Sequence, residues 1–124
     1  MKVLVCGGRT FGVPLKDKPE EQTRAEQECV MRVLSGLPIT HLIHGGAAGA
    51  DTLAGKWAKE AGIPCDVFPA EWDKYGRAAG HIRNSHMLER GKPDLVVAFP
   101  GGPGTADMVR RATSGGVNIE RIVA

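Results

Sequence analysis

The chain has 124 residues, which suits one domain with a single core. Its formal charge of +2, from 16 basic and 14 acidic residues, is too even to favour a nucleic-acid partner. No apolar stretch is long enough to span a membrane, and the three scattered cysteines, without a CxxC pair, indicate reduced thiols in a cytoplasmic protein. The 17 glycines are about twice the usual share, and they cluster just after apolar runs.

The first half of the chain predicts a strand, a helix, a strand, a helix and a strand. Val3 to Cys6 is a short apolar run that ends at a glycine pair, as a buried strand does. From about Glu20 apolar residues recur at four-residue steps, which predicts a helix that ends at Gly36. The elements expected next are a strand from Ile39 to His44, a helix from about Asp51 to Ala61 and a strand from Pro64 to Pro69.

The second half continues the alternation after a polar stretch, Glu71 to Gly80, which we expect to be a surface loop. The elements expected after it are a helix from about Ala78 to Glu89, a strand from Asp94 to Phe99, a helix ending near Thr113 and a strand from Val117 to Val123. Five buried strands alternating with four helices predict the α/β class. We therefore expect residues 1–124 to form a single Rossmann-like domain, an open five-stranded parallel sheet flanked by helices on both faces.

Three of the predicted strands end in glycine pairs, at Gly7-Gly8, Gly45-Gly46 and Gly101-Gly102. In an open parallel sheet these pairs lie on one edge, where ligands bind. Glycine lets backbone N–H groups approach an anion, and the following helix adds its N-terminal partial charge. None of these loops matches GxGxxG or GxxxxGK[ST], so neither a dinucleotide fingerprint nor a Walker-type NTPase is supported.

Four polar side chains near these loops are candidates for ligand contacts. Arg9 follows the first glycine pair and Arg83 lies in the third predicted helix, and either guanidinium can fork onto a phosphate. Asp51 can cap its helix, or bond ribose hydroxyls or a neighbouring loop. Asn84 can bond a ribose or a loop backbone.

Other side chains support weaker hypotheses. Trp72 and Tyr75 can stack on a nucleobase or cover the sheet edge. The four histidines show no metal-ligand spacing with cysteine or carboxylate partners, so we expect no metal site. No serine lies in a GxSxG motif, and no cysteine has a clear histidine partner. We therefore expect no covalent nucleophile.

Motifs along the whole chain resemble the YspA-type (cpYpsA-related) SLOG family, within the superfamily of LOG-type nucleotide hydrolases and DprA-like proteins. The matching residues are Gly7-Gly8-Arg9, Gly45 to Asp51, Trp72, Arg83-Asn84 and Pro100 to Thr105. The resemblance implies a Rossmann-like fold that binds nucleotides or nucleotide-derived ligands. It also implies, through the LOG enzymes, a possible cleavage of the N-glycosidic bond of nucleoside monophosphates.

One position departs from the LOG motif PGGxGTxxE. Pro100, Gly101, Gly102, Gly104 and Thr105 match, but the glutamate position holds Met108. Methionine cannot stabilise the oxocarbenium character that develops as a base leaves. Asp107 is one residue earlier, but one helical step turns a side chain by about 100°.

A hydrolase of this type would therefore need Asp51 or Glu71 to supply the carboxylate, together with Arg83. Our first hypothesis is instead the binding or sensing of a nucleotide-derived small molecule, with no required cofactor. The hydrolase is the second, and a DprA-like contact with single-stranded DNA, which near-neutral charge and few aromatic residues disfavour, is the third.

The hypothesis of a binding protein names a set of ligand-contacting residues and leaves the oligomeric state open. A chain this short has much surface for its core, which is compatible with a homodimer or a higher homo-oligomer. The candidate ligand-binding residues are Gly7, Gly8, Arg9, Gly45, Gly46, Ala47, Gly49, Asp51, Arg83, Asn84, Gly101, Gly102, Gly104 and Thr105.

Overall fold

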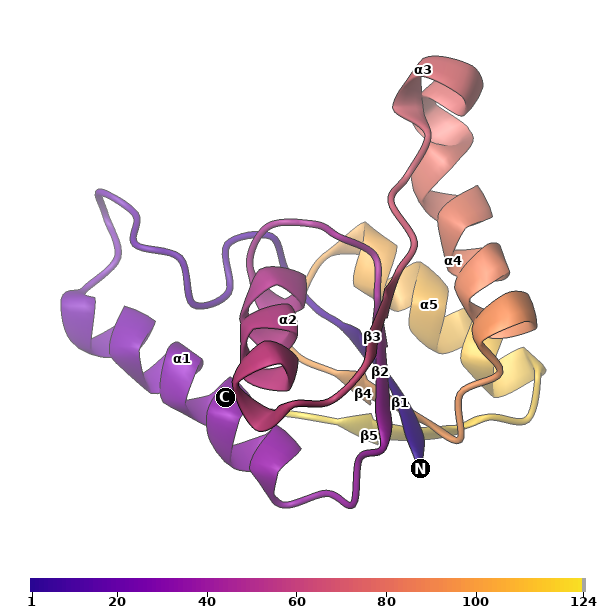
Figure 1. The fold of residues 1–124 in the computed structure, drawn as a ribbon. Helices are drawn as coiled ribbons and strands as arrows, with labels where there is room; N and C mark the ends of the chain where they lie inside the picture. The colour runs from indigo at the N-terminus through magenta and orange to yellow at the C-terminus, as the bar shows by residue number, and fades with distance from the viewer. Residues whose placement is uncertain (124) are drawn as a thin grey trace.

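The apolar run that follows Lys2 forms the central strand of the sheet. In the computed structural model, which describes residues 1–123, β1 (Lys2–Cys6) pairs in parallel with β2 (His41–His44) and β4 (Leu95–Ala98). The edge strands β3 (Cys65–Val67) and β5 (Asn118–Arg121) are also parallel to their neighbours. The order β3-β2-β1-β4-β5 is that of a Rossmann-like sheet (Figure 1).

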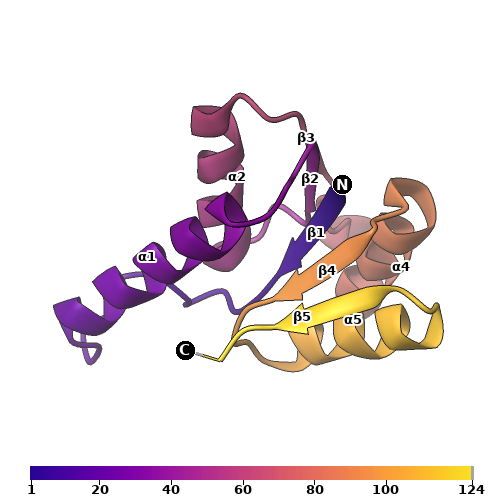
Figure 2. The ribbon, with the colours of Figure 1, turned by 90° about the horizontal axis from the view of Figure 1, so that it is seen from below.

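Helices cover both faces of this sheet, as the sequence predicts. On one face lie α1 (Glu20–Ser35) and α2 (Ala50–Ala61), and on the other α4 (Ala79–Gly91) and α5 (Pro103–Ser114) (Figure 2). Two separate apolar clusters fill the two interfaces. The predicted fold, an open parallel sheet between two helical layers, is confirmed.

Burial differs between the strands, because only the central ones have neighbours on both sides. Val3, Leu4 and Val5 are fully or almost fully buried, whereas Val67 of β3 is 50% exposed. The prediction of five buried strands is therefore wrong for the edge strands, whose side chains are mostly exposed. The first strand begins one residue earlier than predicted, at Lys2, and the other four are shorter than predicted. In β3 this is partly because Pro64 and Pro69, the ends of the predicted strand, cannot donate to a ladder.

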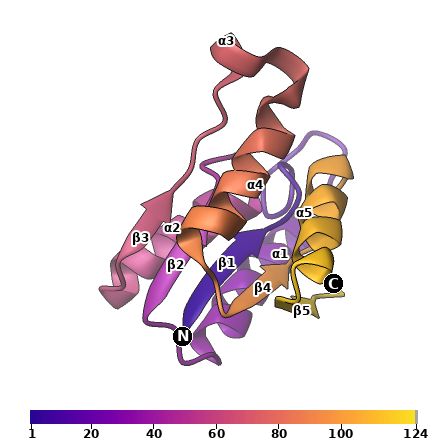
Figure 3. The same cartoon turned by 90° about the vertical axis from the view of Figure 1, so that its right-hand side faces the viewer.

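The stretch from Glu71 to Gly80 is helical, so the prediction of a loop there is wrong. It contains α3 (Trp72–Tyr75) and a 3₁₀ turn, η1 (Gly76–Ala78), and it leads directly into α4. The N–H groups of Lys74 and Tyr75 both donate to the Glu71 carbonyl and so close a helical turn. The sequence of this turn has no apolar periodicity from which a helix could be predicted. Figure 3 shows α3 extending beyond the end of the sheet, above α4.

Close backbone contacts at the carboxyl edge of the sheet join its three glycine loops. The Gly8 N–H donates to the Pro100 carbonyl at 2.8 Å, and the Gly8 carbonyl accepts from Ala50 at 3.2 Å. Gly49 has φ of +78°, and a Cβ there would overlap the Gly8 carbonyl. The loop after β1 is thus held between the loops after β2 and β4.

Replacing Gly49 tests this junction. Gly62, the left-handed C-cap of α2, also has a positive φ (+70°) but has open space around its Cα, so it controls for the positive φ; its ψ is 27°, against −125° at Gly49. We expect Gly62→Ala to cost about 1 kcal/mol of left-handed strain. Gly49→Ala should cost about 1–3 kcal/mol more, because its methyl overlaps backbone. Urea unfolding of both variants measures the difference, and equal losses would contradict the contact.

Candidate functional site

A cleft opens where the strand order reverses, between β1 and β4. Its volume is about 390 Å³. The loops after β1 and β4 lead to helices on opposite faces of the sheet, which leaves a crevice between them. From these loops the lining residues include Gly7, Gly8, Arg9, Gly102, Gly104 and Thr105. The loop after β2, with its helix, and α4 add Ala47, Asp51, Arg83 and Asn84.

The other site residues that the sequence predicted do not line this cleft. Gly45 and Gly46 line an adjoining cavity of about 290 Å³, which shares Arg9 and Arg83 with the cleft. Gly49 and Gly101 pack against Gly8, so they hold the loops together. Glu71 is exposed and lines neither cavity.

Gly102 and Gly104, unlike Gly101 and the glycines of the other two loops, have open surroundings. No atom lies within 4 Å of the Cβ positions of Gly102 and Gly104, whereas a Cβ on Gly8 would lie 2.9 Å from the Pro100 carbonyl. A ligand can therefore approach the backbone closely at Gly102 and Gly104. The glycine pair after β1 instead serves loop packing.

The N-terminus of α5 presents free backbone donors to the cleft. Gly102 is its N-cap and offers no side chain, and Pro103 has no N–H. The Ala106 N–H is bonded to the Gly102 carbonyl at 3.0 Å, while the Gly104 and Thr105 N–H groups have no partner within residues 1–123. Two such amides at a helix N-terminus form a site suited to an anion.

In the loop after β2, side chains bind three backbone N–H groups: Asp51 accepts from two, and Nδ1 of His44 accepts from Gly46. One carboxylate oxygen of the buried Asp51 side chain accepts from the N–H groups of Gly45 and Ala47 at 3.1 and 3.2 Å. Burial raises the pKa of Asp51 to about 6, and these hydrogen bonds and the charge of Arg83 only partly oppose it. The role of Asp51 in the folded chain is thus to order its own loop.

Arg83 also contacts this loop. Its Nη1 donates to the Gly45 carbonyl at 2.8 Å, and its Nε donates to the Asn84 side-chain oxygen at 3.1 Å. Burial lowers the pKa of Arg83, and the carboxylate of Asp51 offsets part of that effect. The guanidinium is held in place at the wall between the two cavities.

Arg9 and Trp72 meet at the rim of the cleft. The guanidinium carbon of Arg9 lies 5.5 Å from the Trp72 ring centroid, within the range of a cation–π contact. Trp72 is 48% exposed and lines both cavities. Tyr75, the other aromatic candidate, lines neither of them and lies beneath the ammonium of Lys74.

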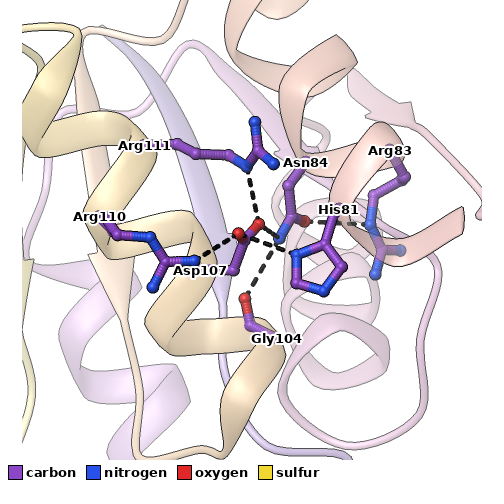
Figure 4. A network of polar contacts seen from close by, with 7 residues as sticks. All are labelled: His81, Arg83, Asn84, Gly104, Asp107, Arg110 and Arg111. Carbon is purple, nitrogen blue, oxygen red and sulfur yellow. Dashed lines mark hydrogen bonds and ion pairs between the residues drawn. The ribbon is translucent and has the colours of Figure 1, made fainter. Parts of the chain in front are cut away.

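A polar network joins α4 to α5 beside the cleft (Figure 4). The Asn84 amide donates to the Gly104 carbonyl and to Asp107, at 3.2 and 3.0 Å. Asp107 is 2% exposed, and its carboxylate also forms ion-pair contacts with the side chains of His81, Arg110 and Arg111. Burial favours a raised pKa for Asp107, but the hydrogen bonds from Asn84, His81 and Arg111 outweigh it and lower the pKa to about 2.

Met108, at the position of the LOG glutamate, is completely buried against the sheet. A residue at this position faces the core rather than the cleft. Asp107, one step earlier on the helix, faces α4 and does not line the cleft. No carboxylate from α5 reaches the cleft, and Asp51 is the one acidic residue among those that line it in residues 1–123.

The structure adds lining residues that the sequence did not indicate. Arg77 of the 3₁₀ turn and His81 in the first turn of α4 both line the cleft. Cys6 lines it as well, and burial, with the charge of Asp51, raises the pKa of its thiol to about 12. Arg77 was missed because it lies within the stretch, Glu71 to Gly80, that we predicted as a surface loop, and His81 directly follows that stretch.

Residues 1–123 contain neither a metal-binding cluster nor a membrane-spanning helix. No group of three or more His, Cys, Asp or Glu side chains is arranged to hold a metal ion. No helix within the same residues has the length and apolar character needed to cross a membrane.

The fold and cleft are those of a Rossmann-like protein with a ligand crevice at the switch point of its sheet. A family model described as the YspA, cpYpsA-related SLOG family matches residues 19–75. The Gene 61 protein of Mycobacterium phage D29 is 35% identical over 125 aligned residues, which cover 95% of this chain and 93% of the phage protein. The chain belongs to the YspA, cpYpsA-related SLOG family.

Two solved structures share the fold. The X-ray structure of TM1055, a structural genomics target, has a TM-score of 0.68 and 21% identity, covering 95% of this chain and 71% of its own. The Moco carrier protein of Chlamydomonas reinhardtii has a TM-score of 0.59 and 19% identity, covering 98% of this chain and 75% of its own. At these identities the likeness establishes the architecture alone.

The raised pKa of Asp51 predicts a pH-dependent stability. Its pKa rises from 3.8 to about 6 on folding, so the folded chain binds this proton more tightly than the unfolded chain. The stabilisation from the protonated form is therefore lost as the pH rises from about 4 to above 6. We expect Asp51→Asn to raise the free energy of unfolding by roughly 2–3 kcal/mol at pH 8 and by little at pH 4.

Urea unfolding of the wild type and of Asp51→Asn at both pH values measures this difference. Taking the difference cancels the titration of the other groups. The exposed Asp66 on β3 supplies a control, since Asp66→Asn should have little effect at either pH. An equal gain for Asp51→Asn at pH 4 and pH 8 would contradict a titrating Asp51.

Proposed function

We propose that the cleft binds the phosphate-bearing part of a nucleotide-derived small molecule. The observation that carries this proposal is the pair of N–H groups of Gly104 and Thr105 at the start of α5, which have no partner in the described part of the chain, residues 1–123. They face a crevice at the switch point of a parallel sheet, the usual place for such ligands. An anion there would gain both the two donors and the helix dipole.

The charge of the cleft supports the same ligand class. Arg9, Arg77 and Arg83 line it, against the single carboxyl group of Asp51. Oδ2 of that carboxyl already accepts two backbone hydrogen bonds, which leaves Oδ1 as its acceptor toward a ligand. A ligand with more than one negative oxygen would match this excess of donors.

The size and rim of the cleft favour a nucleotide over a bare anion. A volume of about 390 Å³ is within the range of small-molecule sites. Trp72 at the rim offers an exposed ring face on which a base could stack. One neighbour in fold is named a Moco carrier protein, which is compatible with a binding role for this architecture.

Hydrolysis of an N-glycosidic bond is less favoured by the geometry. Met108 lies in the core, and Glu71 lines neither cavity. Among residues 1–123, Asp51 remains as the one lining carboxyl group, and its Oδ2 is bound to its own loop. We therefore propose a binding or sensing protein that needs no cofactor.

A thermal-shift screen with nucleoside monophosphates and NAD derivatives tests the proposal. A ligand at 100 times its dissociation constant should stabilise the protein by about 2.7 kcal/mol. Arg9→Ala should weaken that ligand about 10- to 100-fold, because a charged hydrogen bond contributes about 1.5–3 kcal/mol. Arg32→Ala, which removes an exposed arginine of α1 outside the cleft, should leave the affinity unchanged.

Two results would contradict the proposal. One is equal weakening by Arg9→Ala and Arg32→Ala, which would indicate nonspecific attraction. The other is release of free base from the nucleotides that disappears in Arg83→Ala, which would make the protein a hydrolase.

A further inference from the structure

His81 is the one residue lining the cleft whose ring nitrogen is already paired with a buried carboxylate. Its Nδ1 lies 2.9 Å from one oxygen of Asp107, and its side chain is 52% exposed. In Figure 4 the imidazole lies beside Asn84 and above the Gly104 carbonyl, at the start of α5. The pair therefore sits next to the two free amides proposed to hold phosphate.

The partners of Asp107 decide which nitrogen of His81 carries the hydrogen. Asp107 is ionised at neutral pH, since its pKa is about 2, so its oxygens only accept hydrogen bonds. Nδ1 of His81 must then donate to it. In a neutral imidazole the other nitrogen, Nε2, is left as an acceptor.

Further contacts hold this arrangement in place. Arg110 donates to the same oxygen of Asp107 as His81, and Arg111 donates to the other oxygen, at 2.8 and 2.9 Å. Asn84 connects Asp107 to the Gly104 carbonyl and, through its own oxygen, to Arg83. The His81 ring is thus tied to both the start of α5 and the arginine wall of the cleft.

The acceptor on His81 differs from most polar groups that line the cleft, which are donors; Oδ1 of Asp51 is another acceptor there. The free N–H groups of Gly104 and Thr105 and the guanidinium groups of Arg9, Arg77 and Arg83 can only donate. A phosphate oxygen matches these donors but cannot donate to Nε2. A ligand that pairs with the donors and also with Nε2 of His81 must carry a phosphate and a nearby hydroxyl group.

We propose that His81 is a ligand-binding residue whose Nε2 accepts a hydrogen bond from a sugar hydroxyl of a phosphorylated ribose. This inference rests on the proposed phosphate site and narrows its ligand to a sugar phosphate with free hydroxyl groups. Asp107 fixes the ring nitrogen that faces the ligand, which gives this buried carboxylate a role beyond joining two helices.

The test compares three probes at pH 8: AMP, 2′,3′-dideoxy-AMP and inorganic phosphate. Isothermal titration of the full chain should find AMP about three- to tenfold tighter than the dideoxy compound, the effect of one neutral hydrogen bond. His81→Ala should remove this preference by weakening AMP alone. His81→Gln, whose amide oxygen also accepts, should restore part of it.

His41→Ala is the matched control, because His41 is exposed at the start of β2, at the edge of the sheet opposite the cleft. It should leave all three affinities unchanged. Circular dichroism of each variant separates loss of fold from loss of contact.

Each other result overturns the inference in a recognisable way. If His81→Ala weakens both nucleotides equally, the ring contacts the base, and if it weakens inorganic phosphate as much, the ring contacts phosphate. If AMP binds and His81→Ala still binds AMP more tightly than 2′,3′-dideoxy-AMP, His81 does not bind the hydroxyl group, but the phosphate site stands. If the wild type binds none of the three probes, the phosphate site fails as well.

Discussion

The contact of three loops at Gly8 is the constraint on which the rest of this protein depends. The backbone of Gly8 is bonded to Pro100 on one side and to Ala50 on the other, with Gly49 packed against its carbonyl. Side chains at these glycines would separate the loops. Because the loops meet here, the helices that follow them start around one crevice. The cleft is a consequence of backbone packing before any ligand is considered.

Beside this junction, some polar groups of the cleft are hydrogen-bonded within the protein, and others are available to a ligand. Asp51 accepts from two amides of the loop after β2, whereas the Gly104 and Thr105 amides at the start of α5 have no partner among residues 1–123. A phosphate site is therefore favoured on one loop rather than across three, which refines the hypothesis drawn from the sequence. The placement of Met108 in the core follows from the same helix, since the face of α5 that packs on the sheet cannot also supply a catalytic carboxylate.

Much of the fold could be predicted because its signals are local. Apolar runs such as Val3 to Cys6 and the glycines after them indicate strand, turn and helix directly. The errors arose where the signal was weak. The turn of α3 rests on two hydrogen bonds to Glu71, and the exposure of β3 and β5 depends on strand order, which the local sequence does not contain.

For the site, the sequence by itself determined the glycine loops, the two arginines and the substitution of Met108 for a glutamate. Only the tertiary structure decided which of these groups line the cleft and which pack against other loops. It assigned Gly8 and Gly49 to packing and left Gly102 and Gly104 open. It also brought His81 to Asp107, residues on two different helices. The reason is physical: a residue's type limits which bonds it can make, but its partners are set by which elements pack together.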